Sequence, residues 1–183
     1  ALAAAAMSSH LLSRPHVMAW PLLAVWMAEL IKANEDRRAP PWWLLGVMVL
    51  WANLHGSFTL GVLLLGPMAL EALLQAPESQ RLHVFRSWLA FGVATLIAAI
   101  CTPYGWHGIA LTLQISSLSH LQRIGEWMHP GGLALLPLEL WLLMALLLGM
   151  LGYLRVPLVR FIMLIGLLHQ AFMVGRFISV FGL

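Results

Sequence analysis

The chain has 183 residues, of which 61% are hydrophobic and only 9% are charged, whereas about 25% of the residues in an average soluble domain are charged. With a mean hydropathy of +0.88, this composition excludes an ordinary soluble domain and predicts an integral membrane protein. The net charge is +3, but the basic residues are scattered between apolar runs, which is typical of the ends of membrane spans and not of a nucleic-acid-binding stripe.

The apolar runs predict an all-α, polytopic transmembrane helix bundle, because lipid offers the backbone no hydrogen-bond partners. The predicted spans are 15–32, 42–53, 57–74, 86–101, 137–152 and 157–174, with the start of another at 177. We expect one transmembrane domain over 1–183 with an external loop at 102–136. Since the chain begins without Met and stops inside an apolar run, we expect a fragment of a longer protein.

The first span is preceded by Arg14-Pro15-His16. Proline fits the first turn of a helix, where its missing N–H costs nothing, and Arg14 can extend to lipid phosphate. Alternatively, the free N–H groups at this helix end attract an anion, to which Arg14 and His16 add donors. Both interpretations place Arg14 at the membrane boundary.

Residues 42–74 are unusual, because a single helix of this length would measure roughly 50 Å against a hydrocarbon core of about 30 Å. The polar run Asn53-Leu54-His55-Gly56-Ser57 predicts a break, which leaves a half-span at 42–53 and a longer helix at 57–74. Irregular backbone at membrane depth persists where protein or water surrounds it. The break is either a binding site that includes His55, or a tight hairpin in which Asn53 caps carbonyls and Gly56 adopts a positive φ.

Cytoplasmic loops are enriched in Lys and Arg, so the basic residues predict the topology. They flank the broken stretch on both sides: Lys32, Arg37, Arg38, Arg81 and Arg86. With both flanks in the cytoplasm, 42–74 is a hairpin whose tip at 53–57 faces outward. The same topology places Arg14, Arg123 and Arg176 on the outer face, together with most of the histidines.

The external loop contains Arg123, Glu126, Trp127 and His129. Arg123 and Glu126 have the spacing of an exposed ion pair on a short helix. Glu126-x-x-His129 also has the spacing used in di-iron sites, but this chain shows no second such motif. We therefore assign no metal residue, although this carboxylate and imidazole would suit a divalent ion with further ligands from elsewhere.

The last complete span contains His169, and Arg176 follows it. A polar side chain in an apolar helix needs a partner, so His169 is either a functional residue or a hydrogen-bonding residue between helices. Arg176 would then lie near the outer boundary.

These motifs resemble bacterial multispan membrane proteins that are similar to GT-C-fold, polyprenyl-phosphate-sugar-dependent glycosyltransferases. The resemblance lies in Arg-Pro-His at 14–16, Trp-Ala-Asn-Leu-His-Gly-Ser-Phe at 51–58, Thr-Pro-Tyr-Gly at 102–105, Glu-Trp at 126–127 and Arg176. It covers most of the chain. The family's usual Gly-Gly pair is Gly56-Ser57 here, and the basic or His residue often found before the last Arg is missing.

The resemblance implies a protein of the bacterial inner membrane that transfers a sugar from a polyprenyl-phosphate carrier on the periplasmic face, with membrane lipid and the lipid-linked sugar as partners. The family's base lies in the first external loop, which would precede Ala1, so Glu126 is the reserve candidate for the base or a metal ligand. Cations and donors would stabilise the charge that grows on the leaving phosphate: Arg14, His16, His55, Arg123 and Arg176. Orienting roles fall to Asn53, Trp127, His129 and His169.

Two other classes of protein suit the same residues. A transporter or flippase of an anionic lipid or solute also uses a broken helix and a basic lining, but it needs no external acidic base. A structural membrane subunit without chemistry would use the polar residues as pairwise hydrogen bonds between helices.

Overall fold

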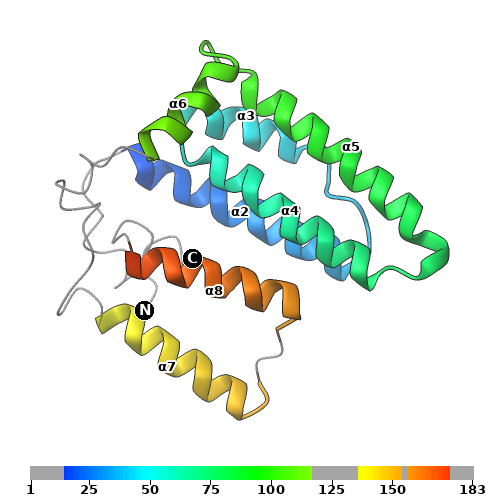
Figure 1. The fold of residues 1–183 in the computed structure, drawn as a ribbon, viewed down its shortest axis with the longest axis vertical. Helices are drawn as coiled ribbons and strands as arrows, with labels where there is room; N and C mark the ends of the chain where they lie inside the picture. The colour runs from blue at the N-terminus through cyan, green and yellow to red at the C-terminus, as the bar shows by residue number, and fades with distance from the viewer. Residues whose placement is uncertain (1–14, 117–135, 154–155, 174–183) are drawn as a thin grey trace. The chain divides into compact units, whose positions relative to one another are not determined.

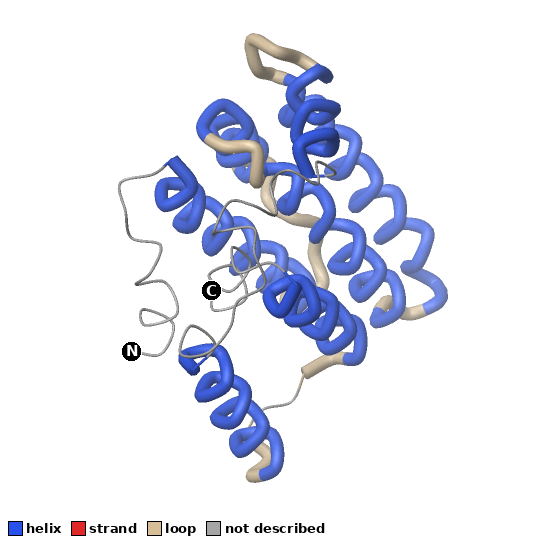
Figure 2. The backbone as a smooth tube through the Cα atoms, turned by 60° about the vertical axis from the view of Figure 1, so that its left-hand side comes forward, coloured by secondary structure: helices blue, strands red, loops and turns tan. Residues whose placement is uncertain are grey.

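A computed structural model of the chain describes residues 15–116, 136–153 and 156–173. Regular elements in these residues are all helices, with no strand among them (Figures 1 and 2), so the predicted all-α fold is confirmed for this part of the chain. Two compact units are formed, Arg14–Ser117 in one and Ala1–Ser13 with Leu118–Leu183 in the other. The single domain over 1–183 stays a prediction.

The unit Arg14–Ser117 contains these helices in chain order: α2 (Pro15–Glu35), α3 (Leu44–Leu54), α4 (Phe58–Gln75), the 3-10 helix η1 (Glu78–Gln80), α5 (Arg81–Ile100) and α6 (Trp106–Ser116). The other unit contains α7 (Leu136–Met150) and α8 (Leu158–Met173). The apolar runs therefore predicted the helices closely. The external loop predicted at 102–136 contains a helix in its first part, because residues 106–116 form α6, which begins just after Gly105 with its φ of 53°.

The 42–74 stretch breaks where the sequence predicts, between Leu54 and Phe58. The chain turns back at this point (Figure 1), so that Trp51 of α3 packs on Gly61 of α4, where a Cβ would lie only 2.6 Å from Trp51 Cζ3. His55 makes the turn with extended backbone, φ −159° and ψ 139°. The predicted positive φ of Gly56 is wrong, since among the described glycines only Gly105 and Gly152 have one.

Two side-chain hydrogen bonds join α2 to α4. Trp26 Nε1 donates to the carbonyl of Gly61 at 3.0 Å, and Asn34 Nδ2 donates to the carbonyl of Met68 at 3.0 Å. The two helices therefore run in the same direction. Helix α3, which lies between them in the sequence, runs in the opposite direction. The core around these contacts contains fully buried apolar side chains: Trp26, Leu30, Leu44, Met48, Trp51, Met68 and Phe91.

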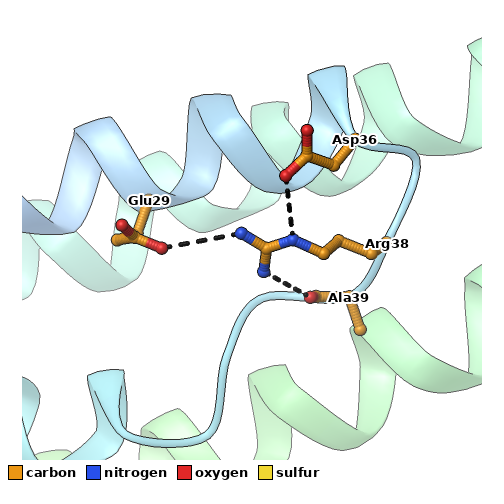
Figure 3. A network of polar contacts seen from close by, with 4 residues as sticks. All are labelled: Glu29, Asp36, Arg38 and Ala39. Atoms are coloured by element: carbon orange, nitrogen blue, oxygen red, sulfur yellow. Dashed lines mark hydrogen bonds and ion pairs between the residues drawn. The ribbon is translucent and has the colours of Figure 1, made fainter.

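Residues 36–43 form an irregular connection from α2 to α3 (Figure 1). Because α3 is short, this connection covers the part of the distance back along α2 that α3 does not cover. Arg38 fixes it: the guanidinium lies 3.6 Å from Glu29 Oε2 and 3.1 Å from Asp36 Oδ2, and it donates to the carbonyl of Ala39 at 3.4 Å (Figure 3). The connection also contains Pro40 and Pro41, which have no N–H group to satisfy.

Two helical segments are long and apolar enough to cross a membrane, Phe58–Gln75 and Glu78–Ile100. Leu44–Leu54, Glu139–Met150 and Leu158–His169 are apolar but shorter. The helix α2 is long enough, but it carries Glu29, Lys32 and Glu35 and is not one of the two. Membrane-length helices are thus present, and the multi-pass arrangement stays a prediction.

Candidate functional site

The candidate site is the turn between α3 and α4, residues 53–57, here called the His55 corner. Ser57 holds it together through three contacts. Trp51 Nε1 donates to Ser57 Oγ at 3.0 Å, and the backbone N–H of Ser57 donates to His55 Nδ1 at 3.1 Å. Ser57 Oγ also lies 2.9 Å from His55 Nδ1. Which of these two atoms donates depends on the tautomer of His55.

The bond from the Ser57 N–H assigns the tautomer of His55. A ring nitrogen that accepts from a backbone N–H carries no proton, so the neutral imidazole carries its hydrogen on Nε2. Through Nδ1, His55 accepts the N–H of Ser57 and stabilises the turn, which agrees with the hairpin interpretation of the sequence. The binding interpretation concerns the other ring nitrogen, Nε2, of this half-buried ring.

Asn53 connects the corner to α5. Its Nδ2 donates to the carbonyl of Val49 at 2.8 Å, one turn earlier in α3, and to the carbonyl of Cys101 at 3.0 Å, just after α5. The predicted capping by Asn53 is therefore confirmed. Its second contact, which the sequence did not indicate, holds the ends of α3 and α5 together.

The helix α6 also lies against the corner, and this explains Gly56. A Cβ on Gly56 would lie 3.1 Å from Thr112 Oγ1, so glycine permits a close approach and not a special φ. The Thr112 hydroxyl donates to the carbonyl of Gly108 at 2.8 Å within α6. Parts of α3, α4, α5 and α6 thus meet at one end of this unit.

The amino end of α4 lies at the corner, but its first N–H groups are engaged. Those of Phe58, Thr59 and Leu60 donate to the carbonyls of residues 55, 56 and 57 at 3.2, 3.3 and 3.0 Å. The helix dipole remains and favours an anion here by about 0.3–1 kcal/mol. An anion at the corner would therefore depend mainly on side-chain donors.

Of the residues predicted for the site, the described part of the chain brings Asn53 and His55 together. His16 lies in the first turn of α2, and His169 is exposed on α8 in the other unit. The remaining candidates lie outside the described residues: Arg14, Arg123, Glu126, Trp127, His129 and Arg176. No group of three or more His, Cys, Asp or Glu that could hold a metal occurs in the part of the chain searched, residues 15–116, 136–153 and 156–173.

The sequence did not indicate the contacts of Trp51 and Thr112 with the corner, or the role of Ser57 as the acceptor for Trp51. Trp51 and Ser57 belong to the quoted motif, but a tryptophan in an apolar run is normally a packing or interface residue. Only the reversal of the chain brings its N–H to Ser57. Thr112 belongs to a helix that was not predicted.

No protein-family model, curated protein or solved structure matches this chain. The likeness to GT-C-fold proteins therefore stays a prediction from short motifs.

Proposed function

We propose that this chain belongs to a multi-pass membrane protein that binds a polyprenyl-phosphate-linked sugar at the His55 corner and transfers the sugar on the periplasmic face. The observation that carries the proposal is the helix break at the corner, where Ser57 fixes His55 with Nδ1 as acceptor. A ring held in this way has a fixed orientation, and hydrogen bonds to a phosphate oxygen depend on the orientation of the donor.

The surface of α4 and α5 supports the membrane location. Only 33% and 28% of the two membrane-length segments is buried, whereas an apolar helix of a soluble core is mostly buried. Their outward positions carry large apolar side chains, including Leu63 at 70% exposure and Ile97 at 56%. Such surfaces are stable in lipid and costly in water.

Exposed aromatic side chains stand beyond one end of these helices, since Tyr104 and Trp106 follow the end of α5. Tyrosine and tryptophan are enriched at membrane–water interfaces, because their rings combine an apolar body with a polar group. Their positions support an interface at this end of α5. Trp42 is exposed as well, but its ring centroid lies 6.0 Å from that of Phe91, midway along α5.

The chemistry follows from the charge that develops during transfer. As the bond between the anomeric carbon and the phosphate oxygen breaks, that oxygen gains negative charge, and a fixed N–H donor stabilises it more than the ground state. The proposal gives His55 this role, with Asn53 orienting the corner and His16, Arg14, Arg123 and Arg176 as further donors. Glu126, or an acidic residue outside this chain, would serve as the base.

A transporter or flippase of an anionic lipid is the second candidate. The observation that favours it is the short helix α3, with only 11 residues, because half-helices that end at polar breaks are a feature of transporter binding sites. The two proposals differ in the fate of the sugar–phosphate bond, which only the transferase breaks.

The test is the His55→Ala variant in proteoliposomes that contain a polyprenyl-phosphate sugar. Loss of one preorganised donor should lower the release of polyprenyl phosphate by roughly 10²- to 10³-fold, with membrane insertion unchanged. His107→Ala is the matched control, because that ring stacks on Trp106 with centroids 3.9 Å apart. Wild-type turnover in His55→Ala would overturn the proposal, and lipid movement without sugar release would favour the transporter.

A further inference from the structure

The turn at the His55 corner depends on the protonation state of one ring nitrogen. His55 Nδ1 accepts the backbone N–H of Ser57 at 3.1 Å, two residues further along the chain. The same bond defines an Asx turn, in which the side-chain oxygen of Asn or Asp accepts this N–H. Histidine can take that place only while Nδ1 carries no proton. Unlike the amide oxygen of Asn, this acceptor is therefore lost when the side chain gains a proton.

A second proton on the His55 ring would bind at Nδ1, because the neutral ring carries its hydrogen on Nε2. The new Nδ1–H could donate to Ser57 Oγ, which lies 2.9 Å away and which has two lone pairs, one of them already used by Trp51 Nε1 at 3.0 Å. The backbone N–H of Ser57 would then face another N–H and lose its acceptor. Protonation thus removes the bond that closes the turn, which costs free energy.

The surroundings of the ring also oppose a positive charge. Ser57 is the N-cap residue of α4, so the ring of His55 lies at the amino end of this helix, where the helix dipole is positive and disfavours a cation. The ring is half-buried, and burial disfavours the charged form of a side chain. Both effects favour the neutral imidazole in the closed turn.

Few other titratable groups stand at this end of the unit among the described residues. Helix α3 contains none, and the first in α4 is Glu71, towards its opposite end. Cys101 and Tyr104 follow α5. His107 stands in α6, and His16 stands in the first turn of α2. Histidine is the side chain that normally titrates between pH 5 and 8, so His16 and His107 are the residues that need controls.

We propose that the His55 corner is a proton-sensitive turn, which is closed while His55 is neutral and opens when Nδ1 gains a proton. The closed turn binds fewer protons than the open chain. Its stability is therefore fully present above the pH at which a free histidine titrates, about 6.5, and is lost as the pH falls below it. Opening releases the ring from the amino end of α4. The proposal does not depend on sugar transfer, because it concerns the turn alone.

The test is hydrogen exchange of the full chain in bilayer nanodiscs at pH 7.5 and pH 5.5. Mass spectrometry measures the amides of residues 55–60, and each rate is divided by the intrinsic rate at that pH to give a protection factor. At pH 5.5 a free histidine is charged about ten times more often than it is neutral. The protection factor of the turn should therefore fall by up to about tenfold between the two pH values, whereas that of the middle of α4 should not change.

The matched variant is His55→Asn, because an Asn side chain can accept the Ser57 N–H and does not titrate. Its turn should have the same protection factor at both pH values. His55→Ala has no acceptor, so its turn should be poorly protected at both. The control variants His16→Ala and His107→Ala keep His55 and should show the same fall in protection as the wild-type protein.

Equal protection of the wild-type turn at both pH values would overturn the proposal, and so would the same fall in His55→Asn as in the wild-type protein. A fall that disappears in His16→Ala or His107→Ala would belong to that histidine and would also overturn it. His55→Asn decides the question even if His55→Ala fails to insert. Sugar release is not part of the measurement, so the proposed transfer stands or falls by its own test.

Discussion

Gly61 is the residue on which the packing of the larger unit most depends. It lies in α4 with its carbonyl bonded to Trp26 and with the ring of Trp51 above its Cα. The Trp51 ring is fully buried, and its N–H is bonded to Ser57, so the ring has little freedom to move. Glycine is therefore required here for space.

Replacing Gly61 with Ala should destabilise the protein. The new Cβ would meet Trp51 Cζ3 at 2.6 Å and Met48 Cε at 3.3 Å, and overpacking of this kind typically costs about 1–3 kcal/mol. Reversible unfolding in mixed detergent micelles would measure the change.

The control is Gly46→Ala in α3, because a Cβ there meets nothing within 4 Å. That substitution should be neutral or stabilising by up to about 1 kcal/mol, since alanine favours a helix. Equal effects of the two substitutions would contradict the close packing of α3 on α4.

At the scale of elements, the turn between α3 and α4 depends on the pair Trp51 and Ser57. Replacing Ser57 with Ala would remove the acceptor at 3.0 Å from the buried indole N–H, and a buried donor without a partner costs about 1–3 kcal/mol. We expect unfolding experiments to show a decrease of this size in the free energy of unfolding. In a Trp51→Phe background the indole N–H is absent. Ser57→Ala should therefore lower the free energy of unfolding by at least about 0.5 kcal/mol less in this background than in the wild-type protein.

Ser87→Ala serves as the control for this cycle. The Ser87 hydroxyl donates to the carbonyl of Val84 within α5, so its loss should change stability by no more than about 0.5 kcal/mol. Additive effects of the Trp51 and Ser57 substitutions would mean that the hydrogen bond contributes nothing to the turn.

The helix break was predictable, because length and polarity indicate it together. An apolar stretch of residues 42–74 exceeds a bilayer, and the polar residues in it fall together at Asn53–Ser57. The predicted pieces 42–53 and 57–74 correspond to α3 at 44–54 and α4 at 58–75. Which residue permits the turn was not predictable, because any residue can adopt the extended backbone that His55 has.

Two features were not predictable for different physical reasons. Residues 106–116 form α6, but a helix of this length cannot span a bilayer and the preceding Pro103 and Gly105 are typical of a loop. The end of α2 lacks the usual signal, since Arg37 occupies the position that glycine prefers. The cavity beside Arg37 depends on contacts between α2, α4 and α5, which no local pattern contains.

At the scale of the molecule, the unit Arg14–Ser117 has two chemically distinct ends. Residues 33–39 and 72–80 line one cavity, so the two basic flanks of the 42–74 stretch lie at the same end, as the hairpin prediction requires. Asn53 bonds to Cys101 at the other end. The flanks and the corner are therefore separated by the length of α4, and the enrichment of cytoplasmic loops in Lys and Arg predicts which end faces the cytoplasm.

Cys101 allows this orientation to be tested, because it is the only cysteine in the chain and it is exposed. A membrane-impermeant maleimide added to intact spheroplasts should label Cys101, which lies at the same end of the unit as the His55 corner. In a Cys101→Ala background, Ser79→Cys places the thiol in the exposed helix η1 at the end with the basic flanks, and labelling should then require permeabilised membranes. The opposite pattern would place the His55 corner in the cytoplasm and remove the periplasmic site. Equal labelling of both thiols in intact spheroplasts would mean that α4 and α5 do not separate two compartments, and the membrane-length helices would then need another role.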